Sequence, residues 1–177
     1  DALNIFRSSF FLDNVTFKNS QSDALDVDFA TGKILNSRFI DIGNDALDFS
    51  GSMVTIDKAA ISNASDKVIS AGERSTLYIK NVYSNNSSVG ITSKDSSAIF
   101  AENVEFNNVD VCLAAFNKKS FFKGGTITID KAPVNCNIPY LVESSSSISI
   151  DNKSVVVNAT DVESMMYGRK FGKATQK

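Results

Sequence analysis

The chain has 177 residues, of which 42% are hydrophobic and 21% are charged, a composition that favours a folded protein with a continuous core. Its formal net charge of -2 excludes a global field that would attract nucleic acid, and the lack of a run of about 18 apolar residues argues against membrane insertion. Histidine is absent, which excludes the commonest general base and the commonest zinc ligand.

A repeat of roughly 22 residues runs along the chain and dictates the expected fold. Aliphatic and polar residues alternate in tracts at 12–17, 34–39, 56–61, 79–84, 101–106, 129–134 and 150–155. The third positions of these tracts are separated by 22, 22, 23, 22, 28 and 21 residues. This alternation has the period of a strand with one buried face, so the tracts predict seven coils.

A second aliphatic column recurs every 22 residues and is formed by Leu3, Leu25, Leu47, Ile69, Ile91 and Leu113. Two columns in one period mean that like residues stack on like, as parallel pairing between successive coils requires. We therefore predict an all-β protein, a right-handed parallel β-helix solenoid of about seven coils. The predicted domains are the β-helix at residues 1–158 and a C-terminal cap or tail at 159–177.

Asparagines recur at one position of the repeat: Asn14, Asn36, Asn81, Asn103 and Asn152. We expect them to form an internal ladder, in which the side-chain amides of successive coils hydrogen-bond one another. The alternative is that these residues only supply turn conformations.

The two ends and one long step depart from the repeat. The 28-residue step places an insertion at about 118–125, a normal position for a binding feature. Residues 161–167 are expected to form a short helix that caps the last coil, followed by a basic tail at 168–173. At the other end an upstream domain or a capping partner is expected to cover the edge at Asp1.

The two cysteines, Cys112 and Cys136, lie 24 residues apart, close to one coil length. They are expected to stack on neighbouring coils, either as a disulfide or as two small buried hydrophobic residues. The second alternative is favoured because free cysteine is commonly buried and inert.

Carboxylates gather beside the second aliphatic column. Asp26 and Asp48 should project side by side from one outward face, and Asp23 and Asp45 should pair in the same way at the adjoining turn. Stacked carboxylates repel unless they are solvated, protonated or bridged by a cation, and calcium suits an all-oxygen site. A calcium site is therefore one hypothesis, and a well-hydrated acidic turn edge is the favoured alternative.

Further coils carry charge on the same side, which becomes mixed and then basic. This strip could bind an acidic polysaccharide through Glu73, Arg74, Lys94, Asp95, Lys118 and Lys119. Lys67, Arg74 and Lys94 are the candidate catalytic residues, and a lysine would act as a base if its neighbours lowered its pKa. Salt-bridge pairing on a solvated face explains the same residues and is favoured.

The coil length, the aliphatic columns and the asparagines resemble the right-handed β-helices of the pectate lyase superfamily. The segments 22–26 (SDALD), 44–52 (NDALDFSGS), 66–73 (DKVISAGE) and 90–97 (GITSKDSS) resemble β-helix modules of secreted bacterial proteins. The resemblance implies an extracellular or cell-surface location in a bacterium. It also implies calcium-assisted β-elimination on an acidic polysaccharide, in which Arg or Lys removes the proton beside the uronate carboxylate.

Three functions follow from these observations. The leading hypothesis is an extracellular module that binds or presents an acidic polysaccharide along the charged strip. The alternatives are a calcium-dependent polysaccharide lyase or epimerase, and a structural spacer of a larger surface protein.

Overall fold

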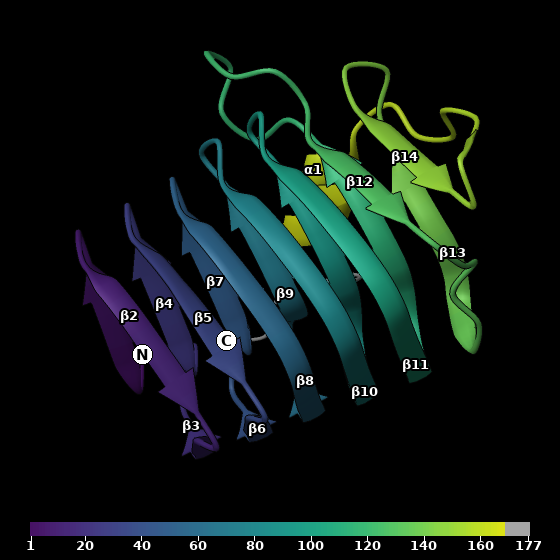
Figure 1. Ribbon diagram of the computed structural model, residues 1–177. Coiled ribbons are helices and arrows are strands. Elements are labelled where there is room, and N and C mark those ends of the chain that lie inside the picture. The colour runs from purple at the N-terminus through teal and green to yellow at the C-terminus, as the bar shows by residue number, and fades with distance from the viewer. Residues whose placement is uncertain (169–177) are drawn as a thin grey trace.

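The computed structural model describes residues 1–168 and is a parallel β-solenoid of about seven turns with a short C-terminal helix. Fifteen strands form its sheet, and all pairs but one are parallel. Figure 1 shows the coils following one another from the N-terminal strands to β14. The prediction of a parallel β-helix is confirmed.

The strands of successive coils pair in three parallel ladders. The first ladder contains β1 (Leu3–Phe6), β4 (Leu25–Asp28), β7 (Leu47–Ser50), β9 (Lys67–Gly72), the ends of β10 (Thr76–Lys94) and β11 (Ala98–Phe116), and β13 (Cys136–Val142). The second contains β2 (Ser9–Asp13), β5 (Thr31–Leu35), the starts of β8 (Met53–Ala64), β10 and β11, then β12 (Thr126–Ile129) and β14 (Ser147–Ile150). The third contains β3 (Thr16–Ser20), β6 (Arg38–Ile42), the end of β8 and the middle of β10 and β11.

The predicted aliphatic column lies in the first ladder and is in register. Leu25 pairs with Leu47, Leu47 with Ile69, and Ile69 with Ile91. All four side chains are fully buried in one core cluster that extends through the stack. Apolar residues on the inner face of each strand therefore build the core, and the outer faces carry the polar residues.

Within residues 1–168 the predicted asparagine ladder is present only between Asn81 and Asn103, Asn36 donates to Asp13 instead, and the prediction that the ladder is internal is wrong. The Asn103 side chain donates to the Asn81 side chain at 2.7 Å, and Asn81 donates to Asp57 at 2.8 Å, yet none of the predicted asparagines is buried. Asn81 and Asn103 have φ of 54° and 51°, the left-handed region that Asn tolerates better than most residues. The repeat therefore places them at outward turns, where they satisfy both the ladder and the turn alternatives.

The cysteines form a disulfide, so the favoured reading of two free cysteines is wrong. Cys112 on β11 and Cys136 at the start of β13 are bonded, with their Cα atoms 5.7 Å apart. Cys112 is fully buried in the main core, and Cys136 packs against the same cluster. The bond thus joins two neighbouring coils of the first ladder across the inside of the solenoid.

The insertion and the helix are found where they were expected. Residues 117–125 form no strand, and α1 (Val162–Tyr167) begins after Asp161, whose side chain accepts a hydrogen bond from the Ser164 amide at 2.9 Å. The helix does not cover the end of the stack. Val162 and Met166 pack against a second apolar cluster that includes Val111 and Phe116, whereas β15 (Lys153–Ser154) pairs with the last coil strand, β14.

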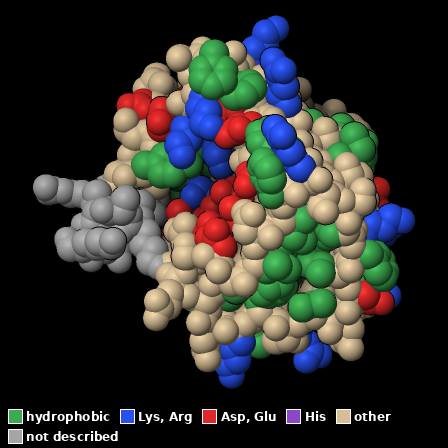
Figure 2. All heavy atoms as spheres, turned by 90° about the vertical axis from the view of Figure 1, so that its left-hand side faces the viewer, with side chains coloured by type: hydrophobic (Ala, Val, Ile, Leu, Met, Phe, Trp, Pro, Cys, Tyr) green, Lys and Arg blue, Asp and Glu red, His purple; other side chains and the backbone are tan. Residues whose placement is uncertain are grey.

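The N-terminal coil leaves apolar side chains exposed. Phe6 is 56% exposed and Phe11 is 62% exposed, and Figure 2 shows a hydrophobic area on this end of the molecule, with acidic and basic side chains beside it. A covering domain or partner at this edge stays a prediction. The predicted basic tail begins at Gly168, and its other residues, 169–173, lie outside the described part of the chain.

Candidate functional site

A charged hollow lies on the outer side of the first ladder. Its walls come from β7, β9, the end of β10, the insertion and the last residue of α1. It is lined by Asn44, Asp45, Asp48, Ser50, Asp66, Lys67, Gly72, Glu73, Lys94, Asp95, Lys118, Lys119 and Tyr167. The coils therefore bring together most of the residues that the sequence predicted for the binding strip.

Lys67 is the most deeply buried cation of the hollow, with 2% of its surface exposed. Its Nζ lies 2.6 Å from Asp66 Oδ2 and 3.4 Å from Asp45 Oδ1. The ring of Tyr167 lies over the same ammonium group, 5.0 Å from Nζ to the ring centroid. Asp45 Oδ1 also accepts a hydrogen bond from the Lys67 backbone amide at 3.0 Å. A buried ammonium group is tolerated only when it is paired in this way.

The protonation of this pair differs from the prediction of a lysine base. Burial opposes the charge of Lys67, but the carboxylates of Asp45 and Asp66 outweigh it and raise the lysine's pKa. Burial also raises the pKa of Asp45 to about 7, although Lys67 opposes this change. Lys67 therefore stays protonated at neutral pH, and the group that titrates there is Asp45.

Lys94 is buried, and its side chain points to residues of the two preceding coils rather than to solvent. Its Nζ lies 2.5 Å from Ser70 Oγ and 3.7 Å from Asp48 Oδ1. Burial lowers its pKa, but Asp48, Tyr167 and Asp45 together outweigh burial and raise it. Burial raises the pKa of Asp48, but Lys94, the Ser70 hydrogen bond and Lys67 together hold it below its usual value. Neither Lys67 nor Lys94 has the lowered pKa that a base at neutral pH requires.

The rim of the hollow is organised by Asp95. Its Oδ1 accepts hydrogen bonds from the backbone amides of Lys118 and Lys119 at 2.8 and 2.7 Å, which fixes the start of the insertion. Its Oδ2 is buried without a hydrogen-bond partner among the described residues. The Lys119 side chain forms an ion pair with Glu73 across two coils. Asp95, Glu73 and Lys119 thus hold one another in place.

Two exposed cations in or next to the lining of the hollow have no carboxylate partner within residues 1–168: Lys118, which lines the hollow, and Arg74, which is not part of the lining but follows the lining residue Glu73. The Arg74 guanidinium lies 5.4 Å from the centroid of the Phe122 ring, and Lys118 Nζ lies 4.2 Å from that of Tyr167. Stacking on a ring orients a cation while leaving its hydrogen-bond donors available. These two side chains are therefore available to an anionic ligand.

The four predicted calcium ligands do not converge on one point. Asp26 and Asp48 are register neighbours, but Asp48 faces Lys94 and Asp45 faces Lys67. Asp23 stabilises the adjoining turn instead. Its Oδ1 accepts hydrogen bonds from the Asn44 side chain at 2.7 Å and from the Asp45 backbone amide at 2.9 Å.

Asp26, like Asp45, is a carboxylate whose ionised form is destabilised. Burial and the negative charges of Asp28 and Asp48 raise its pKa, and the Asn4 side chain donates to it at 2.9 Å. Among the described residues no three side chains of His, Cys, Asp or Glu lie close enough together to hold a metal ion. The donor set does not fit a ready-made calcium site, and calcium binding stays a prediction.

The candidate site residues predicted from the sequence did not include Asp66, Ser70 or Tyr167. Asp66 and Ser70 follow from the repeat, since Ser70 stands one coil after Asp48 and Asp66 adjoins the predicted Lys67. Nothing in the repeat indicates Tyr167, because its position depends on how α1 folds back onto β11.

A comparison with protein families identifies the chain. The pectate lyase family matches residues 1–119, which contain every residue of the charged hollow except Tyr167. No curated protein and no solved structure matches the chain. No helix of the described residues is long and apolar enough to cross a membrane. The match covers well over half of the sequence, and the chain belongs to the pectate lyase family.

Proposed function

We propose that the charged hollow binds a uronate residue of an acidic polysaccharide. The observation that carries this proposal is the pair of exposed cations, Arg74 and Lys118, which lack carboxylate partners in the described part of the chain. Lys118 lines the hollow, and Arg74 directly follows Glu73, which also lines it. The carboxylate of a uronate would accept hydrogen bonds from such groups. Membership of the pectate lyase family supports an acidic polysaccharide as the ligand.

A second candidate function, cleavage by β-elimination, is favoured by Asp45. A carboxylate with a pKa of about 7 is half ionised at neutral pH and can accept a proton there. It would take the proton beside the uronate carboxylate, and the electron pair would form a double bond as the glycosidic C–O bond breaks. The departing oxygen takes a proton from water, and the ammonium group of Lys67 would stabilise the negative charge that develops on the uronate carboxylate as its α-proton leaves. Return of the proton to the opposite face would give an epimerase instead.

Binding is tested with oligosaccharides of galacturonate, of alginate and of glycosaminoglycans by titration calorimetry. We expect the Arg74→Ala/Lys118→Ala variant to bind at least about tenfold more weakly than the wild type, because two charge-assisted contacts are lost. The matched control is Lys18→Ala/Arg38→Ala, which removes one lysine and one arginine from exposed positions of the third ladder. Equal losses in both variants, or no binding to any acidic oligosaccharide, would refute the proposal.

Cleavage is tested on the same oligosaccharides through the ultraviolet absorbance of the unsaturated product. We expect Asp45→Asn to abolish product formation while binding persists, because the amide cannot take the proton. Each assay is run with calcium and with a chelator. Binding should persist with the chelator, since Lys67 and Lys94 already neutralise carboxylates of the hollow. If the wild type forms no unsaturated product from any of these oligosaccharides, the lyase candidate is excluded, which leaves a binding module or a structural spacer.

We also infer that the protein folds in an oxidising compartment. Structural disulfides form and persist outside the cytosol in most organisms, and Cys112 and Cys136 form one between two coils. This supports the expected extracellular location, and a bacterial source stays a prediction.

A further inference from the structure

A second groove, separate from the charged hollow, lies on the outer face of the second ladder. It crosses β8, β10, β11, β12 and the residues after β14. Its lining consists of Thr55, Tyr78, Ile79, Lys80, Phe100, Ala101, Glu102, Thr128, Ile129, Asp130, Asp151 and Asn152. It shares no residue with the charged hollow, which belongs to the first ladder.

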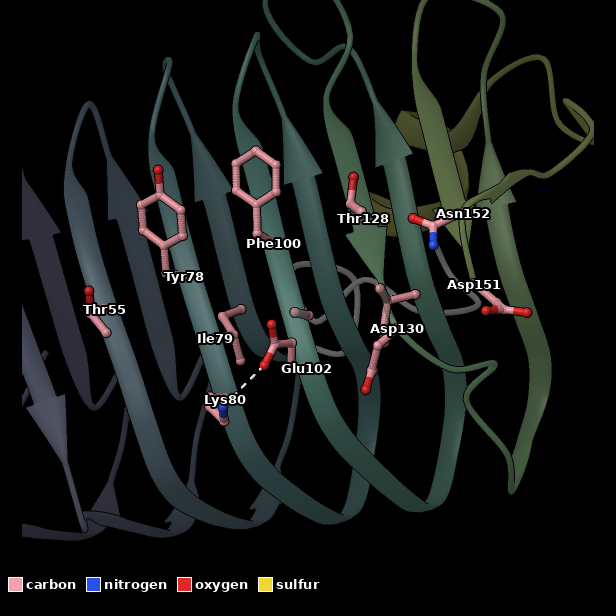
Figure 3. Close-up of a pocket in the computed structure, with 12 residues that line it drawn as sticks. Thr55, Tyr78, Ile79, Lys80, Phe100, Glu102, Thr128, Asp130, Asp151 and Asn152 are labelled. Carbon is pink, nitrogen blue, oxygen red and sulfur yellow. Dashed lines mark ion pairs between the residues drawn. The ribbon is translucent and has the colours of Figure 1, made fainter.

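Two aromatic side chains form the middle of this groove. Tyr78 and Phe100 are register partners on β10 and β11, with ring centroids 5.4 Å apart and ring planes within 15° of each other. They remain 49% and 44% exposed. Figure 3 shows the two rings side by side with their faces turned outward from the sheet. They therefore form a small flat apolar platform of the kind on which the C–H face of a pyranose ring stacks.

Polar side chains flank the platform along the axis of the solenoid. Thr55 is the register neighbour of Tyr78 on one side, and Thr128 is that of Phe100 on the other. Lys80 and Glu102 lie beside the rings as an exposed ion pair of 3.2 Å. Hydroxyl, ammonium and carboxylate groups around an aromatic platform are suited to the hydroxyl groups of a sugar chain.

The charge of the groove distinguishes its ligand from that of the charged hollow. One cation, Lys80, stands among three carboxylates, those of Glu102, Asp130 and Asp151. An excess of negative charge disfavours a uronate polymer. We propose that this groove binds a neutral polysaccharide of linked pyranose units, which lies along the row from Thr55 to Thr128 with sugar rings on Tyr78 and Phe100.

The test uses neutral hexasaccharides of (1→4)-linked glucose, xylose and mannose, and hexagalacturonate as the acidic comparison. Binding is measured by titration calorimetry and by tyrosine fluorescence, which is readable because the chain has no tryptophan. We expect at least one neutral hexasaccharide to bind, and the Tyr78→Ala/Phe100→Ala variant to bind it at least about tenfold more weakly. Tyr78→Phe keeps the stacking face and should retain most of the affinity.

The matched control is Tyr83→Ala/Phe6→Ala, which removes exposed aromatic residues from the third and first ladders. Thermal unfolding of each variant verifies that the fold is intact. The proposal is overturned if no neutral hexasaccharide binds, if the control loses as much affinity, or if hexagalacturonate alone depends on Tyr78 and Phe100. Sedimentation showing a wild-type dimer that the double variant dissociates would assign the platform to self-association and overturn it as well. Hexagalacturonate binding that depends on Arg74 and Lys118 tests the charged hollow independently.

Discussion

At the scale of single residues, the buried pair of Asp45 and Lys67 distinguishes the charged hollow from an ordinary solvated surface. Surface ion pairs contribute little and require no special environment, whereas the residues Asp45 and Lys67 are only 4% and 2% exposed. Burial raises the pKa of Asp45, and the adjacent carboxylates keep Lys67 charged. Groups in a hollow whose pKa values are strongly shifted are typical of functional sites. The site is therefore better described as an acid beside a fixed cation than as a lysine base.

The raised pKa of Asp45 predicts a pH-dependent stability. Its pKa is about 7 in the folded state and 3.8 as the reference value for the unfolded chain, so the folded state binds more protons between these values. The free energy of unfolding contributed by this group therefore falls as the pH rises from about 4 to about 7 and is level above that. Asp45→Asn should lack this component.

The measurement is urea unfolding of both proteins at a series of pH values. The free energy of unfolding of the variant, minus that of the wild type, should increase from pH 4 to pH 7. A difference that stays constant, or that decreases with pH, would contradict the assignment of the raised pKa to Asp45.

At the scale of elements, the long strands β10 and β11 and the helix α1 position the hollow. Each of these strands contributes to all three ladders, so their ends carry Lys94 and the insertion to the same side as β7 and β9. Helix α1 packs against Val111 and Phe116 and brings Tyr167 over Lys67 and Lys118. The disulfide links β11 to β13 through the main core and joins these neighbouring coils.

Removal of the disulfide is expected to destabilise the protein. The bond closes a chain segment with a sequence separation of 24, and cross-links of this size typically contribute about 2–4 kcal/mol. The Cys112→Ala/Cys136→Ala variant should lose a free energy of unfolding in this range in denaturant titrations. A reductant should weaken the wild type and leave the variant unchanged. A variant as stable as the oxidised wild type would show that the bond contributes nothing to stability.

At the scale of the whole molecule, stability comes from a core that continues from coil to coil. The aliphatic column of the first ladder is fully buried from Leu25 to Leu113, but Leu3 in the edge coil is only partly buried. In a solenoid each coil contacts only its neighbours, so an edge coil has one stacking partner and an inner coil has two. Equivalent residues of the repeat should therefore differ in their contribution to stability.

A pair of matched substitutions tests this difference. Ile69→Ala in an inner coil should lower the free energy of unfolding by about 2–5 kcal/mol, because it removes a fully buried side chain and leaves a cavity. Leu3→Ala at the same register position of the edge coil should cost clearly less. Denaturant unfolding measures both, and equal losses would contradict a core that weakens toward the N-terminal edge.

The solenoid, its coil length and the position of the insertion could all be predicted from the amino-acid sequence. A strict period fixes which residues stack one coil apart, because parallel strands pair in register. For the same reason it predicted that Asp26 and Asp48 are neighbours and that charge gathers on one side of the stack.

The burial and the partners of those charged side chains depend on how the chain packs in three dimensions. The period does not encode how deeply a side chain on an outer face is covered, and so the burial of Lys67 and Lys94 could not be predicted from it. The period also does not predict contacts between residues two coils apart, such as the Lys119–Glu73 ion pair, or contacts from outside the repeat, such as the Tyr167 ring over Lys67. These contacts depend on the closure of the insertion and on the packing of α1, which only the folded chain fixes.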